Sequence, residues 1–258
     1  MSKTISRDVV ILRAPRIGDP LVGAVSALGC RVYQWPVQKI TPIGADDLHV
    51  VAQLDSIDSY DTFIFVSGYA AALALRWLDR ARPTLHLVGD CFAVGPTSAA
   101  PLEQRSIPVL YPPRLWTTEG LLALPALCQV TGKKILIFRG RGGLSRLGDV
   151  LVERGASVEY CELYDRAVDY QFRKEIVAML HNGGDTVLIA HAGGVIDDLL
   201  TVSGSENAAL VQNIPIVVPG ERLRDYARQA GFRRVITATS AVAADMESAL
   251  IGWYTPKQ

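Results

Sequence analysis

Short runs of apolar residues alternate with segments of helical spacing along the whole chain. Runs of four to six residues bounded by turn residues are typical of buried strands, whereas apolar positions three and four residues apart are typical of helices. The runs predict strands at residues 9–12, 31–36, 62–66, 108–111, 134–138 and 158–163. The helical spacing predicts helices at residues 20–28, 69–79 and 119–127, and one more that ends at Gly155.

One stretch leaves a choice, because residues 85–88 and 91–94 are both apolar runs. The second run leads directly into the turn Gly95-Pro96 and a helix expected from about Thr97. We therefore place the strand at residues 91–94.

The series of elements restarts about halfway along the chain. Arg139 ends a strand as Arg13 does 126 residues earlier, and Gly155 follows Gly29 by the same interval. Residues 186–191 correspond to residues 62–67 at an offset of 124, and residues 234–236 to residues 108–110 at 126. Landmarks that agree in order and in element type indicate an internal duplication.

Strands that alternate with helices predict parallel sheets with helices on both faces. Each half of the chain supplies about five strands, enough for one flavodoxin-like sheet. The predicted fold is α/β, with two three-layer lobes related by duplication. Ligands of such sheets bind outside the carboxyl ends of the strands, so we expect the functional site in a cleft between the lobes.

Composition removes several classes of function. The 26 basic and 26 acidic residues balance, so no overall charge favours nucleic acid or an anionic membrane. No apolar run approaches the roughly 18 residues of a membrane span, and we expect a cytoplasmic protein. The four cysteines form no CxxC pair and the four histidines are scattered, so neither a metal centre nor a disulfide framework is predicted.

The expected carboxyl ends of the strands carry small, hydroxyl or basic residues, mostly just before a helix. Backbone amides at a helix start are free donors and favour anions, so several such ends would suit carboxylates or phosphates. The same residue types are also ordinary helix caps and turn residues. The sequence lacks GxGxxG, the GK[ST] of a phosphate loop, GxSxG and HExxH, which argues against nucleotide, serine-nucleophile and zinc chemistry.

Tyr164 ends the predicted strand at residues 158–163, in the segment Leu163-Tyr164-Asp165-Arg166. A tyrosine at that position would donate a proton or a hydrogen bond to a ligand. Its ring would equally well fill the space at a crossing between the lobes. Position alone does not choose between these two roles.

Six segments in order resemble the uroporphyrinogen-III synthase family over nearly the whole chain. They are residues 11–16 (ILRAPR), 62–68 (TFIFVSG), 93–99 (AVGPTSA), 118–122 (TEGLL), 132–143 (GKKILIFRGRGG) and 151–166 (LVERGASVEYCELYDR). The resemblance implies a discontinuous lobe of residues 1–37 and 168–258, and an inserted lobe of residues 40–163. Crossing segments near residues 37–40 and 163–168 would form a two-stranded hinge.

The resemblance also implies an activity, that of a cyclising hydro-lyase. Hydroxymethylbilane, with eight carboxylates, would lose water and close to uroporphyrinogen III with its terminal pyrrole inverted, by way of an azafulvene cation and a spiro intermediate. Tyr164 matches the family tyrosine proposed to assist departure of the hydroxyl. No cofactor or metal is implied, and we expect a monomer.

By the same matching, residues at the strand ends become candidates for binding the substrate. They are Arg13, Ser67, Gly68, Thr97, Ser98, Arg139 and Gly140. Family members often have Thr-Ser where this chain has His191-Ala192, and serine where it has Gly220. Gly193 and Gly220 would then contribute backbone amides in place of side chains. A different class remains open: a non-catalytic binder of a polyanionic small molecule, which would need the strand-end donors but not Tyr164.

Overall fold

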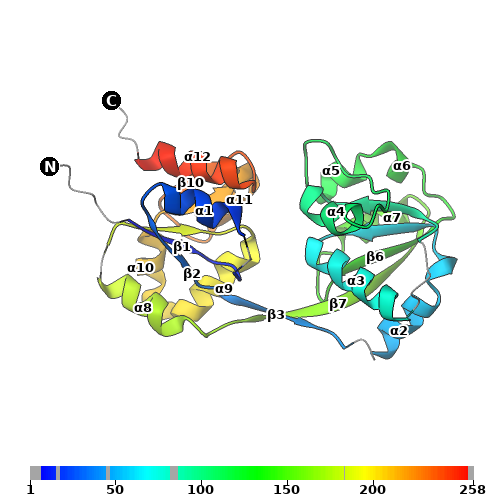
Figure 1. Ribbon diagram of the computed structural model, residues 1–258, viewed down its shortest axis with the longest axis horizontal. Coiled ribbons are helices and arrows are strands. Elements are labelled where there is room, and N and C mark those ends of the chain that lie inside the picture. The colour runs from blue at the N-terminus through cyan, green and yellow to red at the C-terminus, as the bar shows by residue number, and fades with distance from the viewer. Residues whose placement is uncertain (1–6, 16–17, 45–46, 82–86, 183, 255–258) are drawn as a thin grey trace. The chain divides into compact units, whose positions relative to one another are not determined.

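A computed structural model describes residues 7–15, 18–44, 47–81, 87–182 and 184–254 (Figure 1). The chain divides into two compact units, which we call unit 1 (Met1–Lys39 and Ala167–Gln258) and unit 2 (Ile40–Arg166). Unit 1 is therefore assembled from both ends of the chain, and unit 2 is continuous. The family resemblance implies that the chain passes from one lobe to the other near residues 37–40 and 163–168. In the structure, the boundaries between the two units lie after Lys39 and after Arg166.

Unit 1 is built on a five-stranded sheet in the order β10-β9-β8-β1-β2. All neighbouring strands of this sheet pair in parallel. The strands are β1 (Asp8–Ile11), β2 (Arg31–Gln34), β8 (Thr186–Ile189), β9 (Ile216–Pro219) and β10 (Val235–Ala238). The helices are α1 (Pro20–Ala27), α8 (Arg173–Asn182), α9 (Gly193–Ser203), η2 (Ser205–Asn207), α10 (Ala208–Asn213), α11 (Gly220–Gln229) and α12 (Ala243–Tyr254).

Unit 2 has its own five-stranded sheet in the order β3-β7-β6-β4-β5. Strands β4, β5, β6 and β7 pair in parallel. The strands are β3 (Gln38–Pro42), β4 (Thr62–Phe65), β5 (Asp90–Ala93), β6 (Lys134–Gly140) and β7 (Ser157–Val168). The helices are α2 (Leu48–Asp55), η1 (Ile57–Ser59), α3 (Gly68–Ala81), α4 (Pro96–Glu103), α5 (Thr118–Leu122), α6 (Pro125–Cys128) and α7 (Arg146–Glu153).

Four strands of each sheet follow the same topology. Counted along unit 1, the strand order is 2-1-3-4-5, which is the order of flavodoxin-like sheets. The run β7-β6-β4-β5 of unit 2 matches β2-β1-β8-β9 of unit 1. Strand β6, from the second repeat of the sequence, therefore pairs with β4 from the first. The predicted α/β fold with parallel sheets is confirmed, and each unit combines strands from both repeats.

Both faces of each sheet are buried, which explains the nearly continuous apolar runs in the sequence. Phe63 and Phe65 of β4 join a core with residues of α2 and α3, whereas Ile64, between them, packs with residues of α5 and α7 on the other face. In unit 1, Val10 faces the side of α8 and α9, and Val9 faces the side of α1 and α12 (Figure 1). Alternate side chains of one strand thus supply two cores, giving three layers in each unit.

Turn residues end the elements where the sequence predicts. Helix α1 begins after Asp19, whose carboxylate accepts the amide N–H of Leu21 at 3.1 Å, and it ends just before Gly29. Gly29 has a φ of 80° and Gly155 has a φ of 86°, a region that glycine enters without a Cβ clash. The predicted helix ends at these two glycines are therefore confirmed.

Strand β5 spans Asp90–Ala93, so the choice of the run at residues 91–94 is confirmed. The competing run at residues 85–88 begins at Leu85 and His86, which lie outside the described residues.

The strand expected at residues 158–163 does not end at Tyr164, because β7 continues to Val168. Two other predicted elements are interrupted, and proline explains both. The helix expected at residues 119–127 is broken into α5 and α6, because Leu124 precedes Pro125 and takes extended angles (φ −64°, ψ 130°). The strand expected at residues 108–111 is a single bridge, from Leu110 to Phe92. Pro108 lacks an N–H, and Pro112 follows closely, so the segment has few donors for a ladder.

Candidate functional site

The side chain of Tyr164 lies within unit 2, close to the carboxyl ends of β4 and β6. It is only 1% exposed, and among the residues that the structure describes it is the largest fully buried side chain. Its hydroxyl lies 3.2 Å from the hydroxyl of Ser67 and accepts a hydrogen bond from Nη2 of Arg166 at 2.8 Å. The ring of Tyr69 meets the tyrosine ring edge-on, with the centroids 5.0 Å apart. Ser67 and Arg166 thus contact the hydroxyl of Tyr164, and Tyr69 packs against its ring.

An irregularity in the sheet contributes to this position of Tyr164. Strands β6 and β7 pair residue by residue up to Arg139 and Glu162, after which Gly140 pairs with Tyr164 and Leu163 is passed over. A bulge of this kind changes the direction of the side chains that follow it. The amide N–H of Arg141 donates to the carbonyl of Tyr164 at 2.8 Å beyond the bulge. A Cβ on Gly140 would lie 2.5 Å from Cε2 of the tyrosine ring, so a bare glycine backbone is what the ring packs against.

Ser67 and Gly68 begin helix α3. The Ser67 hydroxyl accepts the amide N–H of Ala70 at 3.0 Å and so caps the helix, in addition to its contact with Tyr164. A Cβ on Gly68 would lie 2.5 Å from the carbonyl oxygen of Thr97, so α3 and α4 approach closely at this point. Thr97 is exposed in the first turn of α4, and Ser98 beside it is buried. Four of the predicted residues therefore lie at two neighbouring helix starts.

The side chain of Arg139 bonds to other residues of unit 2. Its guanidinium pairs with Glu162 at 2.9 Å, lies 3.6 Å from the centre of the Tyr160 ring and donates to the carbonyl of Gly143 at 3.0 Å. These bonds hold the loop that follows β6. In the described structure, the predicted substrate-binding arginine is therefore already engaged by a carboxylate.

The predicted residues of unit 1 lie at the corresponding strand ends of its own sheet. Arg13, just after β1, donates from Nη2 to both carboxylate oxygens of Asp19 at 2.7 and 2.8 Å. The Asp19 side chain is only 2% exposed, so the guanidinium neutralises a buried charge. Gly220, the first residue of α11, has a φ of 75°, and nothing lies within 4 Å of a Cβ built there.

Gly193 begins helix α9 beneath an aromatic ring. A Cβ at this glycine would lie 3.0 Å from Cε1 of Tyr226, so a side chain there would press on that ring. The Tyr226 hydroxyl donates to Asp197 at 2.5 Å, and this hydrogen bond raises the pKa of Tyr226 above its ordinary value. The start of α9 thus presents a glycine backbone next to a phenol and a carboxylate.

The structure brings Ser67, Gly140 and Tyr164 into direct contact, and Gly68 into contact with Thr97. It places Arg13, Gly193 and Gly220 in unit 1. Sequence reasoning missed Arg166 and Tyr69 as partners of the tyrosine. A signal for Arg166 was available, because residues two apart on a strand share a face, and Arg166 follows Tyr164 by two on β7.

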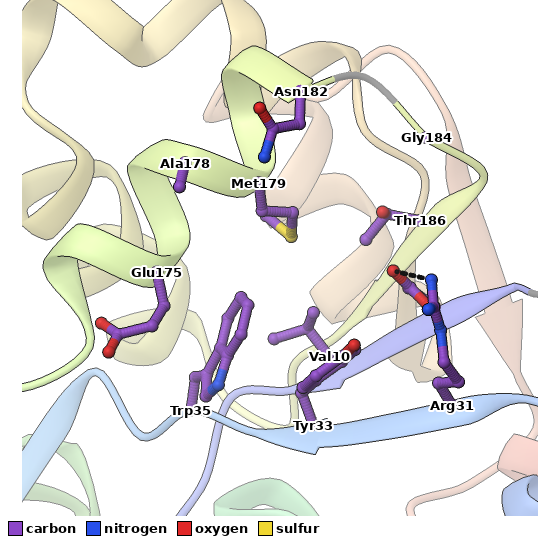
Figure 2. Close-up of a pocket in the computed structure, with 11 residues that line it drawn as sticks. Val10, Arg31, Tyr33, Trp35, Glu175, Ala178, Met179, Asn182, Gly184 and Thr186 are labelled. Carbon is purple, nitrogen blue, oxygen red and sulfur yellow. Dashed lines mark hydrogen bonds and ion pairs between the residues drawn. The ribbon is translucent and has the colours of Figure 1, made fainter.

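Unit 1 also contains a cavity of about 350 Å³ between helix α8 and the sheet (Figure 2). Tyr33, Trp35 and Met179 form its apolar wall, and the ion pair of Arg31 with Asp8 (2.7 Å) lies at one side. Three lining residues, Asp8, Arg31 and Thr186, are the first residues of their strands. The cavity therefore lies toward the amino ends of the strands, and none of the predicted site residues lines it.

Among the described residues, no group of three or more His, Cys, Asp or Glu side chains is arranged to hold a metal ion. None of the described helices combines the length and apolar character that crossing a bilayer requires.

The fold and the residues at its strand ends define a class: a duplicated α/β protein with two flavodoxin-like units that exchange strands between repeats. The chain belongs to the uroporphyrinogen-III synthase family, because residues 19–247 match the family model described as "Uroporphyrinogen-III synthase HemD". The uroporphyrinogen-III synthase of Salmonella typhimurium LT2 is 31% identical over 237 residues, covering 90% of this chain and 95% of that protein. The Escherichia coli K12 enzyme is 31% identical over 240 residues, covering 90% of this chain and 95% of that enzyme.

Solved structures agree on the fold. A crystal structure of a mutant uroporphyrinogen III synthase from the extremely thermophilic bacterium Thermus thermophilus covers 96% of this chain and 97% of its own, with a TM-score of 0.68 and 18% identity. The structure of uroporphyrinogen-III synthetase from Helicobacter pylori 26695 covers 96% of this chain and 99% of its own, with a TM-score of 0.62 and 14% identity. At these identities the likeness concerns the fold alone.

Proposed function

We propose that this protein converts hydroxymethylbilane to uroporphyrinogen III with loss of water and inversion of the terminal pyrrole. The observation that carries the proposal is the 31% identity to a uroporphyrinogen-III synthase over 90% of the chain. Support within the chain comes from Tyr164, which matches the family tyrosine in position and has a hydroxyl held by Ser67 and Arg166.

The first chemical step is departure of the hydroxyl. The hydroxymethyl oxygen takes up a proton and leaves as water, while an electron pair from the pyrrole nitrogen forms the azafulvene cation. The substituted α-carbon of the terminal pyrrole then attacks this cation and forms the spiro intermediate. The bond from that carbon to the methylene bridge of the third pyrrole breaks, and this methylene bonds instead to the free α-carbon of the terminal pyrrole, which inverts the ring. The proton lost from that free α-carbon on closure balances the proton used at the start. Tyr164 is proposed to donate that first proton or a hydrogen bond to the leaving oxygen, a role for which a phenol is chemically suited.

The protein's remaining task is to control the shape of a flexible polyanion. Helix starts present free amide donors and the positive end of the helix dipole, and both features suit carboxylates. We propose nine substrate contacts: Arg13, Ser67, Gly68, Thr97, Ser98, Arg139, Gly140, Gly193 and Gly220. Holding the substrate in the conformation that leads to the inverted ring would be worth several orders of magnitude in rate, as in other reactions that depend on orientation.

The activity is tested by incubating the protein with enzymatically generated hydroxymethylbilane, oxidising the product and separating the type I and type III isomers by chromatography. We expect the type III isomer in excess over a protein-free control. The type I isomer alone, which forms spontaneously, would rule out the synthase and favour a binder without catalysis. The same assay after dialysis against a chelator tests the expectation that no metal or cofactor is needed.

The role of Tyr164 is tested by Tyr164→Phe, with Tyr60→Phe as a matched control. Both substitutions remove the hydroxyl of a buried tyrosine in unit 2, since Tyr60 is 7% exposed and Tyr164 is 1% exposed. The Tyr60 hydroxyl also makes a hydrogen bond, which it donates to Glu159 at 2.8 Å. We expect Tyr164→Phe to lower the rate of type III formation by about 100-fold or more, the usual range for loss of a proton donor. Tyr60→Phe should retain the rate. Equal rates in the two variants would assign the Tyr164 ring to packing.

A cytoplasmic monomer remains part of the proposal. Sedimentation equilibrium of the purified protein tests the monomer, and fractionation of the producing cells tests the compartment.

A further inference from the structure

The burial of Tyr164 raises a problem for its proposed role. A proton donor must contact the substrate, yet only 1% of this residue is exposed. The tyrosine oxygen already accepts a hydrogen bond from Arg166, and Ser67 lies 3.2 Å away. Some group must therefore move before the hydroxyl can meet a substrate.

Arg166 is the neighbour of Tyr164 that is free to move. It is exposed and lies near the end of β7, and its guanidinium carbon is 5.3 Å from the centre of the tyrosine ring. Ser67, in contrast, is fixed by the helix cap it forms with Ala70. An exposed arginine side chain exchanges rotamers rapidly, whereas a helix cap is part of the folded backbone.

Arg166 also differs in charge pairing from the other arginines at the strand ends. Arg13 is paired with Asp19 and Arg139 with Glu162. Within the part of the chain that the structure describes, no carboxylate lies within ion-pair distance of Arg166, whose hydrogen bond goes to a neutral phenol. A guanidinium prefers a carboxylate, because it can donate two parallel hydrogen bonds to the two oxygens of an opposite charge, whereas a phenol offers a single uncharged oxygen.

We propose that Arg166 binds a carboxylate of the substrate and, in doing so, releases the hydroxyl of Tyr164 for the reaction. The substrate would take the guanidinium away from the phenol oxygen, because its carboxylates are better acceptors. The tyrosine would then keep Ser67 as its fixed partner and turn its own proton toward the leaving oxygen. This inference rests on the proposed function, and it makes Arg166 a binding residue that also positions Tyr164.

The first test compares Arg166→Gln and Arg166→Lys with Arg233→Gln, a matched change of an exposed arginine before the amino end of β10. The probe is uroporphyrin III, the oxidised product, which keeps all eight carboxylates. We expect Arg166→Gln to raise its Kd about tenfold, the effect of losing one charged hydrogen bond. Arg166→Lys should recover part of the affinity, and Arg233→Gln should bind as the unmodified protein does.

The second test separates this role from a merely structural one. In Tyr164→Phe the guanidinium has no phenol oxygen to leave, so uroporphyrin III should bind about three to ten times more tightly than to the unmodified protein. The gain should disappear in the double variant Arg166→Gln/Tyr164→Phe. A structural contact between the two residues would give no gain in either variant.

The outcomes separate the inference from the proposed function. If the unmodified protein makes the type III isomer but Arg166→Gln binds uroporphyrin III normally, the inference is wrong and the function stands. If Tyr164→Phe binds no more tightly, release of the hydroxyl by a carboxylate is wrong. If only the type I isomer forms, the proposed function fails, and the binding data then report on a polyanion site alone. Melting curves of each variant establish that it is folded.

Discussion

The contact between Gly140 and Tyr164 leads to a quantitative prediction for Gly140→Ala. The added Cβ would lie 2.5 Å from Cε2, 2.7 Å from Cζ and 3.0 Å from Cδ2 of the ring. Carbon atoms in contact stay about 3.5–4.0 Å apart, so the ring must retreat by about 1 Å. The ring is not a flexible end that can swing aside, because Tyr69 meets it edge-on.

The retreat would affect stability and activity to different extents. Forcing one extra carbon into a packed site costs about 1–3 kcal/mol of the free energy of unfolding. A shift of about 1 Å would also take the tyrosine oxygen beyond hydrogen-bond distance of Ser67, now 3.2 Å away. Misplacing a reacting group by about 1 Å lowers rates by about 100-fold. We therefore expect a folded protein that forms the type III isomer about 100 times more slowly.

The assay combines thermal melting with the isomer analysis for Gly140→Ala, Tyr164→Ala and the double variant. If the new methyl group clashes with the Tyr164 ring, Gly140→Ala should lower the melting temperature much less in the Tyr164→Ala background, where the ring is absent, than in the unmodified protein. Gly23→Ala is the control, because nothing lies within 4 Å of a Cβ built there, and it should be neutral or slightly stabilising. A Gly140→Ala protein with normal rate and stability, or an undiminished cost in the double variant, would refute the reasoning.

Two further predictions concern buried charges and thiols. Arg13→Met leaves the buried carboxylate of Asp19 without its ion-pair partner and should lower the free energy of unfolding, measured by chemical denaturation, by about 3–5 kcal/mol. Adding Asp19→Asn should recover most of that loss. A loss below about 1 kcal/mol in Arg13→Met would contradict the ion pair as a source of stability. Burial raises the pKa of Cys91 and of Cys161 from 9.0 to about 12. Because these thiols ionise earlier in the unfolded chain, their contribution to stability is complete below pH 9 and is lost as the pH rises toward 12. Between about pH 9 and 12, each thiol should lower the free energy of unfolding by about 1.4 kcal/mol per pH unit. The free energy of unfolding of Cys161→Ala should therefore fall less steeply with pH than that of the unmodified protein. Equal slopes for the two proteins would contradict the raised pKa of Cys161.

The functional residues were only partly predictable from sequence. Ser67 and Tyr164 lie in segments that resemble a known family and were expected at strand ends, and the structure places their hydroxyls 3.2 Å apart, with Tyr164 inside β7. Gly140 was expected to bind substrate, and the structure adds a packing reason for a glycine there. Arg166 was not singled out, although its place two residues after Tyr164 on one strand indicates a shared face. The sequence pattern does not show that its guanidinium bonds the phenol oxygen rather than water.

Local pattern determined the elements of this protein and their order. A buried strand needs apolar residues, a helix needs apolar positions at its own period, and Gly29 and Gly155 end helices because they enter a region that side chains disfavour. The duplication is likewise visible in the chain, since it is a property of spacing. Even the two interrupted elements have a local cause, because Pro108 and Pro125 carry the signals that interrupt them.

Tertiary structure alone decided which elements meet. Strand β1 pairs with β8, which joins Asp8 to Thr186, and β6 pairs with β4, which joins Ile135 to Thr62. Such pairings depend on how two distant faces fit and bury one another, which no local propensity encodes. The surroundings of Tyr164 arise in the same way, from a bulge in β6 and β7 and a helix start nearly a hundred residues earlier in the chain.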